Sequence, residues 1–260
     1  MADAILKVNG VGHVFAPEDG AGPVEALRDI SFEVRAREFV AIVGPSGCGK
    51  STLCELAAGL LRPTRGTLFL KDEPIHGPHP AVGIVFQEDS TLPWLTAQEN
   101  VGFGLRMRGL SRSEWELRAT RMMTLMGLAG FERHYPRQLS GGMRQRVAIA
   151  RTLVLHPELI LMDEPFGALD AQTRLLLGEE LLQIWERVGT TILFVTHDIA
   201  EAVRLADRVI VMSARPGRIK RVVDVPLPRP RDLEDPAALA EADRLVAAIW
   251  RDLRAEATIR

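Results

Sequence analysis

The chain has 260 residues, of which 47% are hydrophobic and 25% are charged, and its formal net charge is −2. This length accommodates one large domain or two small ones, and the composition is that of an ordinary soluble globular protein. From the charge, the absence of a long apolar run and the N-terminal sequence, we expect no nucleic-acid binding, no membrane span and no secretory leader.

The N-terminal third of the sequence predicts mainly β structure. Its β-prone stretches are Ile5–Val8, Ile30–Val34, Phe39–Val43, Thr67–Leu70 and Val82–Phe86. A turn-rich insert, Ala16–Pro23, separates the first two of these stretches. From about residue 90 to residue 138 the pattern becomes helical, and we expect two or three helices inserted here.

Helices and strands alternate in the following part of the chain. We expect helices at Met143–Leu155 and Arg174–Val188, and strands at Leu159–Met162, Thr191–Thr196 and Arg208–Met212. Such alternation predicts a parallel sheet covered by helices.

A tail begins near Arg221. Its prolines predict an extended segment at Leu227–Arg231, and Asp235 and Pro236 start an amphipathic helix. The apolar face of this helix either packs on the body of the chain or serves as a docking surface for another subunit. These residues are Leu239, Ala242, Leu245, Val246, Ile249, Trp250 and Leu253.

The stretch Gly44–Ser51 reads G-x-x-x-x-G-K-S and lies between the apolar run Phe39–Val43 and a segment with helical spacing at Leu53, Leu56, Ala57 and Leu60. The glycines let backbone N–H groups face inward, and the helix adds its positive N-terminal end. Lys50 can then reach the β- and γ-phosphates of a nucleotide, and the Ser51 hydroxyl can bind Mg²⁺. The alternative is a Gly-rich turn without a ligand. Nucleotide contacts are expected at Gly44, Pro45, Ser46, Gly47, Cys48, Gly49, Lys50, Ser51 and Thr52.

Polar residues follow three of the predicted strands, at the carboxyl edge where α/β sheets bind ligands. Asp163 suits Mg²⁺, and Glu164 is the candidate to polarise an attacking water. Gln87 can contact Mg²⁺ or water, and His197 can hydrogen-bond the γ-phosphate. Taken alone, each could be a turn, a polar strand end or a structural side chain. The expected catalytic residues are Gln87, Glu164 and His197, and the expected metal ligands are Ser51, Gln87 and Asp163.

A second anion site is predicted at Leu139–Met143. Ser140, Gly141 and Gly142 stand at the start of a predicted helix. One chain therefore has two phosphate-binding devices for one nucleotide. A two-fold dimer resolves this, because each phosphate loop can then face the other subunit's Leu139, Ser140, Gly141 and Gly142.

Together these motifs resemble the ATP-binding cassette of ABC transporters over roughly residues 5 to 215. The resemblance implies an α/β fold with a P-loop NTPase core, a mixed but largely parallel sheet, an N-terminal antiparallel β portion and a helical insertion subdomain. It implies a cassette at residues 1–220, with the insertion at about 88–142, followed by a C-terminal segment at 221–260.

The resemblance also assigns single residues. Asp170 is expected to contact the dimer partner, and Phe15 to stack on adenine, where the family more often has Tyr. Arg37 stands in a turn where the family usually has Gly. The segments Phe86–Thr96 and Leu227–Arg231 are similar to the importer branch for nitrate, sulfonates and taurine.

We therefore expect an ATPase with ATP and Mg²⁺ as its cofactors, acting as a homodimer that drives solute uptake through a separate membrane permease. An extracytoplasmic solute-binding protein would be an indirect partner, and the location would be peripheral, at the cytoplasmic face of the inner membrane. One alternative is a soluble cassette ATPase in translation or DNA repair, although such proteins usually carry two cassettes or a coiled-coil insertion. Another is a regulatory module without turnover, against which Glu164 and His197 argue.

The two cysteines, Cys48 and Cys54, are expected to be reduced thiols. Cys48 lies beside Lys50 and near a helix N-terminus, a setting that favours the thiolate. We expect thiol reagents to inhibit turnover and ATP to protect. The alternative is a buried, inert cysteine.

Overall fold

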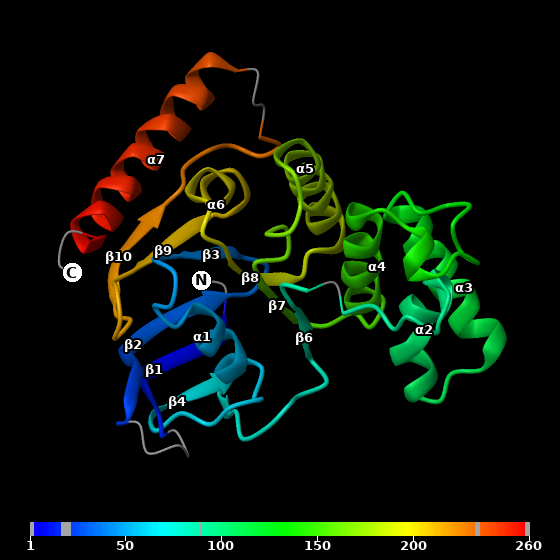
Figure 1. Cartoon of the computed structure of the whole chain (residues 1–260), viewed down its shortest axis with the longest axis horizontal. Coiled ribbons are helices and arrows are strands. Elements are labelled where there is room, and N and C mark those ends of the chain that lie inside the picture. Colours follow the sequence, from blue (N-terminus) through cyan, green and yellow to red (C-terminus); the bar gives the residue numbers. More distant parts are fainter. Residues whose placement is uncertain (1–2, 17–21, 89, 232–234, 258–260) are drawn as a thin grey trace. The chain divides into compact units, whose positions relative to one another are not determined.

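The computed structural model describes residues 3–16, 22–88, 90–231 and 235–257 (Figure 1). They form two compact units, one made of Met1–His79 and Thr191–Arg260 and the other of Pro80–Thr190. The domain boundaries expected from the sequence stay a prediction.

The first unit contains a four-stranded antiparallel sheet with the order β2-β1-β4-β5 (Figure 1). Its strands are β1 (Ala4–Phe15), β2 (Val24–Arg35), β4 (Arg65–Leu70) and β5 (Glu73–Pro74). In β2, the buried Ile30, Phe32 and Val34 alternate with exposed residues, as expected for a sheet with one face on the core. The predicted strands here are confirmed, although β1 and β2 are longer than the β-prone stretches. Residues 17–21 of the turn-rich insert lie outside the described residues.

The same unit contains strands in the order β10-β9-β3-β8. The strand β3 (Phe39–Val43) pairs in parallel with β8 (Thr191–Val195) and β9 (Arg208–Met212), and β10 (Ile219–Asp224) is antiparallel to β9. Every residue of β3 and β8 is buried, which explains their continuous apolar sequences. The strand β10 was not predicted, because most of its residues are exposed and show no apolar alternation.

Two helices of this unit pack on its strands, and the C-terminal helix described below does so as well. The helix α1 (Lys50–Ala57) contacts β8 and β2, and α6 (Ile199–Leu205) contacts β3 and β9. The helix α1 ends at Ala57, so the prediction that Leu60 continues its apolar face was wrong, and Leu60 is half exposed.

The C-terminal helix α7 (Pro236–Ala257) begins after Asp235, whose carboxylate accepts hydrogen bonds from the backbone N–H groups of Ala237 and Ala238. It packs on α6 and β9 and buries Ala242 and Ile249, while Leu239 and Trp250 stay exposed. The predicted apolar face therefore packs on the body of the chain through its central residues.

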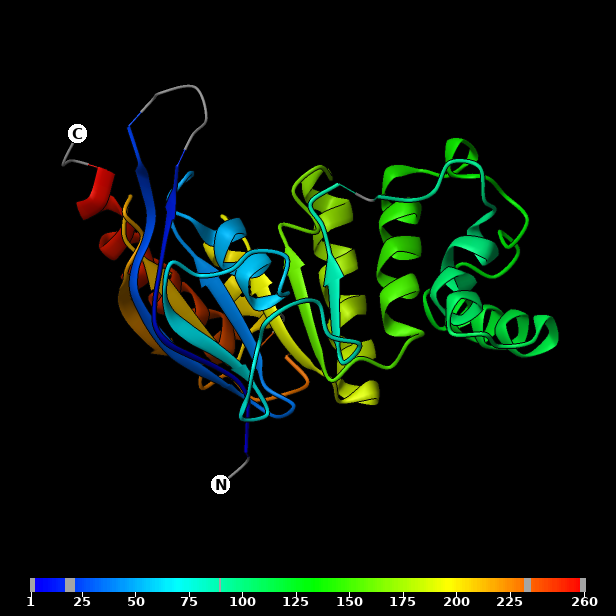
Figure 2. The same cartoon turned by 90° about the horizontal axis from the view of Figure 1, so that it is seen from below.

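The second unit contains two parallel strands, β6 (Val82–Val85) and β7 (Leu159–Asp163), and the inserted helices. The helices α2 (Ala97–Met107) and α3 (Arg112–Leu125) pack together beside α4 (Gly141–Leu153), as the green ribbons of Figure 2 show. A short 3₁₀ helix (Pro136–Gln138) precedes α4, and α5 (Ala171–Val188) follows β7. The α/β class, the antiparallel N-terminal portion and the helical insertion are confirmed.

A fully buried amide, Asn100, holds the start of α2. Its Oδ1 accepts a hydrogen bond from the backbone N–H of Leu92 (2.7 Å). Its Nδ2 donates to the carbonyls of Leu92 (3.1 Å), Leu95 (3.1 Å) and Thr96 (3.0 Å). Thr96 and Glu99 add a capping box at the same helix end. The side chain of Asn100 therefore bonds to three residues of the loop Leu92–Thr96, which leads into the helical insertion.

Candidate nucleotide-binding site

The phosphate loop joins β3 to α1 through glycines that no other residue can replace without strain. Gly49 has φ +98°, and a Cβ atom there would lie 2.7 Å from Leu27 Cδ2 and 3.0 Å from the Ala26 carbonyl oxygen. Gly47 also has a positive φ, +73°. The motif thus has the backbone geometry that a phosphate-binding loop needs.

Lys50 lies over this loop, and its side chain is buried. Its Nζ donates hydrogen bonds to the carbonyl oxygens of Gly44 (3.0 Å) and Pro45 (3.2 Å). The N-cap of α1 is Gly49, so the helix has no side-chain cap, and its first turn has no acidic residue. Uncapped N–H groups at a helix N-terminus favour an anion, so this arrangement fits the phosphates of a nucleotide. Ser51 is exposed and Thr52 half-buried at this end of α1.

A segment far along the sequence supports the loop, and the sequence did not indicate it. Arg215 Nε donates to the Gly47 carbonyl oxygen (3.0 Å). The backbone N–H of Gly217 donates to Ala26, and a Cβ at Gly217 would lie 2.0 Å from the Cys48 carbonyl oxygen. The cationic groups of Lys50 and Arg215 thus hold three carbonyls of the loop, those of Gly44, Pro45 and Gly47. The sequence feature that could have indicated this support is the turn-forming run Arg215-Pro216-Gly217.

The prediction of a reactive Cys48 thiolate was wrong in its physical basis. Cys48 is 1% exposed, and burial raises the pKa of its thiol above the ordinary value of 9.0, although the charge of Lys50 acts in the opposite direction. The structure therefore favours the alternative of a buried cysteine. Cys48 and Cys54 are both free thiols, as expected.

His197 lies at the same sheet edge as the phosphate loop. The parallel register pairs Ile42 with Val195, so both chains leave the sheet in the same direction. The backbone N–H of Thr196 donates to the Ile42 carbonyl (3.1 Å). Within the first unit, the structure thus brings together the loop and the histidine that the sequence singled out.

The second unit places Gln87 and the acidic pair at one edge of its own strands. The register pairs Val85 with Met162, so Gln87 and Asp163 both follow the carboxyl ends of β6 and β7. Gln87 is exposed and Glu164 is half-buried. Glu164 has φ +44°, an uncommon value for a residue with a side chain, and its carbonyl accepts a bond from Gly167 N–H (3.0 Å).

The Ser-Gly-Gly element forms the N-terminus of α4. Ser140 is the N-cap, and its Oγ accepts a hydrogen bond from Met143 N–H (3.2 Å). A Cβ at Gly142 would lie 2.9 Å from Thr173 Cγ2, so close packing on α5 requires this glycine. Gln87 and Gly141 both line a pocket of about 620 Å³ in this unit.

Asp170 is the N-cap of α5. It accepts bonds from the Thr173 backbone N–H (3.0 Å) and the Thr173 hydroxyl (2.7 Å), and these bonds hold the pKa of Asp170 below its ordinary value. The carboxylate is therefore charged at neutral pH.

Phe15, the candidate adenine contact, ends β1 and is 41% exposed. Its ring meets His13 edge-on, with the centroids 4.6 Å apart. Arg37 has φ +63°, which agrees with the turn position where the sequence suggested a replaced glycine.

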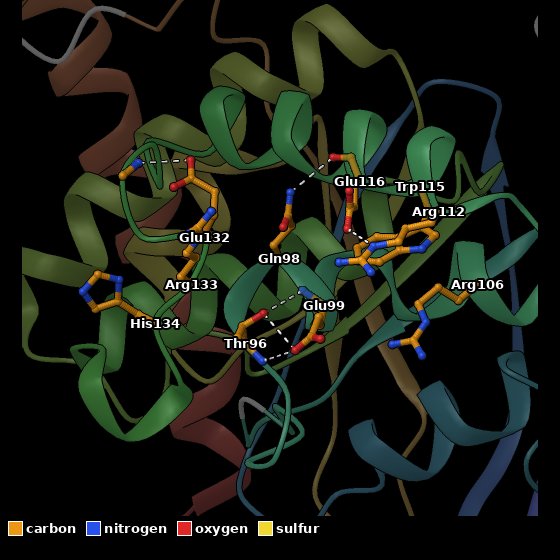
Figure 3. A pocket seen from close by; sticks show the side chains of 11 residues that line it. Thr96, Gln98, Glu99, Arg106, Arg112, Trp115, Glu116, Glu132, Arg133 and His134 are labelled. Atoms are coloured by element: carbon orange, nitrogen blue, oxygen red, sulfur yellow. Dashed lines mark hydrogen bonds and ion pairs between the residues drawn. The ribbon is translucent and has the colours of Figure 1, made fainter.

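A larger pocket of about 1120 Å³ lies in the helical part of the second unit (Figure 3). Its lining carries charged residues of both signs. Arg112 pairs with Glu116 (2.7 Å), and the Arg106 guanidinium lies 5.6 Å from the centre of the Trp115 ring. Figure 3 shows Thr96 and Glu99, the capping box of α2, among the residues that line this pocket.

None of the described helices has the length and apolar character needed to cross a membrane. Among the described residues, no cluster of three or more His, Cys, Asp or Glu side chains is arranged to hold a metal ion. The predicted Mg²⁺ ligands Ser51, Gln87 and Asp163 are oxygen donors, which Mg²⁺ prefers, together with substrate phosphates and water.

A family model described as ABC transporter matches residues 27–167, more than half of the chain. The chain belongs to the ABC transporter family, and it is an ATPase of the ATP-binding cassette type. It resembles a solved dimeric ATP-binding cassette bound to ADP and Pi, with 33% identity and a TM-score of 0.74, over 85% of this chain and 98% of that one. The family predicted from the motifs is confirmed.

The curated relatives include ATP-binding proteins of importers. The chain is 48% identical over 223 residues to a nitrate import ATP-binding protein of Synechocystis sp. (86% of this chain, 83% of that protein). It is 44% identical over 226 residues to an aliphatic sulfonates import ATP-binding protein of Bacillus cereus (87% and 88%). It is 48% identical over 194 residues to a taurine import ATP-binding protein of Yersinia pestis (75% and 76%). The predicted resemblance to this branch is confirmed.

Proposed function

We propose that this ATPase is the energy-coupling subunit of an importer for a small solute of the nitrate, sulfonate or taurine kind. The observation that carries the proposal is the phosphate loop, in which the left-handed Gly49 and the buried Lys50 frame the uncapped N-terminus of α1. The names of the relatives support the importer branch.

The proposed roles in hydrolysis follow the chemistry of each side chain. The loop N–H groups and Lys50 bind the phosphates of ATP. Ser51, Gln87 and Asp163 would hold Mg²⁺, which would supply positive charge to neutralise the phosphates. Glu164 orients and polarises the attacking water, and His197 donates a hydrogen bond to the γ-phosphate. Phe15 stacks on adenine.

We also propose a homodimer in which the Ser-Gly-Gly element of one subunit contacts the nucleotide of the other. Ser140 uses a lone pair of its Oγ to cap α4, so its O–H remains chemically able to donate to a phosphate. The positive end of α4 adds to this site. The trans contacts are Leu139, Ser140, Gly141, Gly142 and Asp170.

The proposed membrane partner is a separate permease that meets the segment Phe86–Thr96. Trp94 is 69% exposed there, and the charged pocket of Figure 3 starts at Thr96. An exposed aromatic residue beside a rim of both charges is typical of a docking surface. In this arrangement the chain is peripheral, at the cytoplasmic face of the inner membrane, and the extracytoplasmic solute-binding protein is an indirect partner. The relatives, which are named as import ATP-binding proteins, do not favour the alternative role in translation or DNA repair.

Glu164→Gln tests the chemistry and the partner in one preparation. The variant should bind ATP and stay dimeric while losing most of its turnover, because a neutral amide cannot polarise the water as a carboxylate does. Glu158→Gln, an exposed position just before β7, is the matched control and should hydrolyse ATP normally. Normal turnover in Glu164→Gln would refute the assigned role.

The tagged Glu164→Gln chain is then recovered from its native membranes with Mg-ATP and mild detergent, and its partners are identified by mass spectrometry. A polytopic membrane protein supports the importer proposal. A ribosomal, DNA-bound or purely soluble partner supports the alternative, with the ATPase chemistry unchanged.

A further inference from the structure

The extended segment Leu227–Arg231 brings the guanidinium group of Arg231 to the end of α6. Arg231 Nη1 donates to the carbonyls of Val203 (2.8 Å) and Arg204, and its Nη2 donates to Ala206 (2.6 Å). These carbonyls belong to the last turn of the helix and the residue after it, where backbone acceptors have no partner within the helix. Arg231 therefore acts as a C-terminal cap supplied from a distant part of the chain.

Arg229 makes a second connection beside the first. Its Nη2 donates to the Leu205 carbonyl and to Asp207 Oδ1, both at 2.7 Å, and its Nε donates to the same carboxylate oxygen (3.0 Å). The other oxygen of Asp207 accepts a bond from Phe39 N–H (2.9 Å). Phe39 begins β3, the strand that leads to the phosphate loop. Arg229 thus ties the end of α6 to the start of β3, while Arg231 holds the end of α6 alone.

The opposite end of α6 holds the residues on either side of His197. Thr196 donates from Oγ1 to Glu201 Oε2 (2.5 Å), and its Oγ1 accepts from Asp198 N–H (3.0 Å). Glu201 N–H donates to Asp198 Oδ1 (3.0 Å). Thr196 and Glu201 are both buried, so these bonds are shielded from water. Thr196 and Asp198, the residues on either side of His197, are therefore both hydrogen-bonded to Glu201 of α6.

A helix of seven residues is not stable by itself, so the place of α6 depends on its packing against β3, β9 and α7 and on the bonds that hold its two ends. We propose that Arg229 and Arg231 are positioning residues for His197, which act by fixing α6. This inference rests on the role proposed above for His197. Removal of the guanidinium of Arg231 leaves the last carbonyls of α6 without their donors, and the helix moves together with Glu201. The Thr196 and Asp198 bonds then carry the shift to His197.

Arg231→Ala tests this inference, because Arg231 contacts α6 without the link to β3 that Arg229 has. A displacement of about 1 Å at a reacting group can cost about 100-fold in rate, so we expect kcat to fall about 10- to 100-fold. The KM for ATP and the affinity for labelled ATP should stay within about twofold, since the phosphate loop keeps its contacts. Arg231→Lys keeps the charge but not the planar fork, and its kcat should be intermediate.

Arg244→Ala is the matched control, because that guanidinium pairs with Glu241 on the surface of α7. It should leave kcat unchanged. Thermal unfolding is followed in all variants, and Arg231→Lys replaces Arg231→Ala if the alanine variant does not fold. An unchanged kcat in the folded variant, or an equal loss in Arg244→Ala, would overturn the inference.

A double-mutant cycle with His197→Ala separates positioning from general destabilisation. If Arg231 acts through His197, Arg231→Ala causes no further loss of kcat in the His197→Ala background. If the two losses multiply, Arg231 acts by another route and the inference fails. Full turnover in His197→Ala would overturn the proposed role of His197 itself. A slow His197→Ala beside a fully active Arg231→Ala would overturn only the positioning inference.

Discussion

Replacing Asn100 with Ala should loosen the start of the helical insertion without touching the nucleotide site. The side chain is fully buried and connects α2 to the loop Leu92–Thr96 through one acceptor and one NH₂ group. That loop carries Trp94, the exposed residue proposed to face the permease. The change therefore tests whether a single buried amide fixes the proposed docking segment.

The size of the effect follows from the bonds. Asn100 accepts from Leu92 N–H, and its NH₂ group shares two hydrogens among three carbonyls, so the side chain supplies the equivalent of about three bonds. Each contributes about 1 kcal/mol net, and Leu92, Leu95 and Thr96 are half-buried, so water can partly replace them. We expect a loss of about 3 kcal/mol, which corresponds to an increase of about 100-fold in local opening.

Hydrogen exchange measured by mass spectrometry reports this opening directly. Peptides covering Leu92–Met107 should exchange about 100-fold faster in Asn100→Ala, while peptides from β2 keep their protection. Gln98→Ala is the control, because the half-buried Gln98 donates one good bond, to Thr120 Oγ1 (2.7 Å). An exchange rate in Asn100→Ala within about threefold of the wild type would refute the reasoning.

Three further predictions concern the phosphate loop. Lys50→Ala should weaken nucleotide binding by about 100-fold or more in a labelled-ATP titration, because a charged hydrogen-bond donor to the phosphates is lost; an unchanged affinity would contradict the assignment. Cys48 should react with iodoacetamide at neutral pH at least about tenfold more slowly than a cysteine introduced at the exposed Ser113→Cys, because burial protects it and raises its pKa. Because the pKa of Cys48 is raised in the folded protein, the stability that the protonated thiol contributes is present below the ordinary value of 9.0 and is lost as the pH rises through the folded value. A Cys48→Ala variant should therefore lose less stability than the wild type at alkaline pH. Equal labelling rates at Cys48 and at Ser113→Cys would contradict the prediction of slow labelling at Cys48.

The features that the sequence predicted well depend on neighbours in the chain. The phosphate loop needs glycines at positive φ between a strand and a helix, and Gly47 and Gly49 are spaced for this within a single motif. Buried parallel strands such as β3 and β8 show continuous apolar runs, so their ends, and the residues that follow them, could be located. His197 was placed at the correct edge for this reason.

The features that were missed depend on contacts between distant segments. The strand β10 is mostly exposed, and α6 has only seven residues, so neither has a clear apolar period. The sequence showed the charge of Lys50 beside Cys48. It did not show that Gly217, from the turn after β9, would pack against the Cys48 carbonyl, nor that Cys48 would be 1% exposed. Local charge was visible and burial was not, and burial has the larger effect on this pKa.

The bonds of Lys50 affect what its substitution measures. In the structure its ammonium group already donates to the Gly44 and Pro45 carbonyls, so binding a phosphate exchanges or adds to existing partners. The affinity lost in Lys50→Ala therefore includes the cost of a loop that has lost its internal donor, as well as the contact with the phosphate. Arg215 holds a third carbonyl, that of Gly47, from outside the loop and remains in that variant. Because this support persists, the loop of Lys50→Ala should keep its shape near Gly47, and the residual affinity reports what the backbone N–H groups and the end of α1 contribute by themselves.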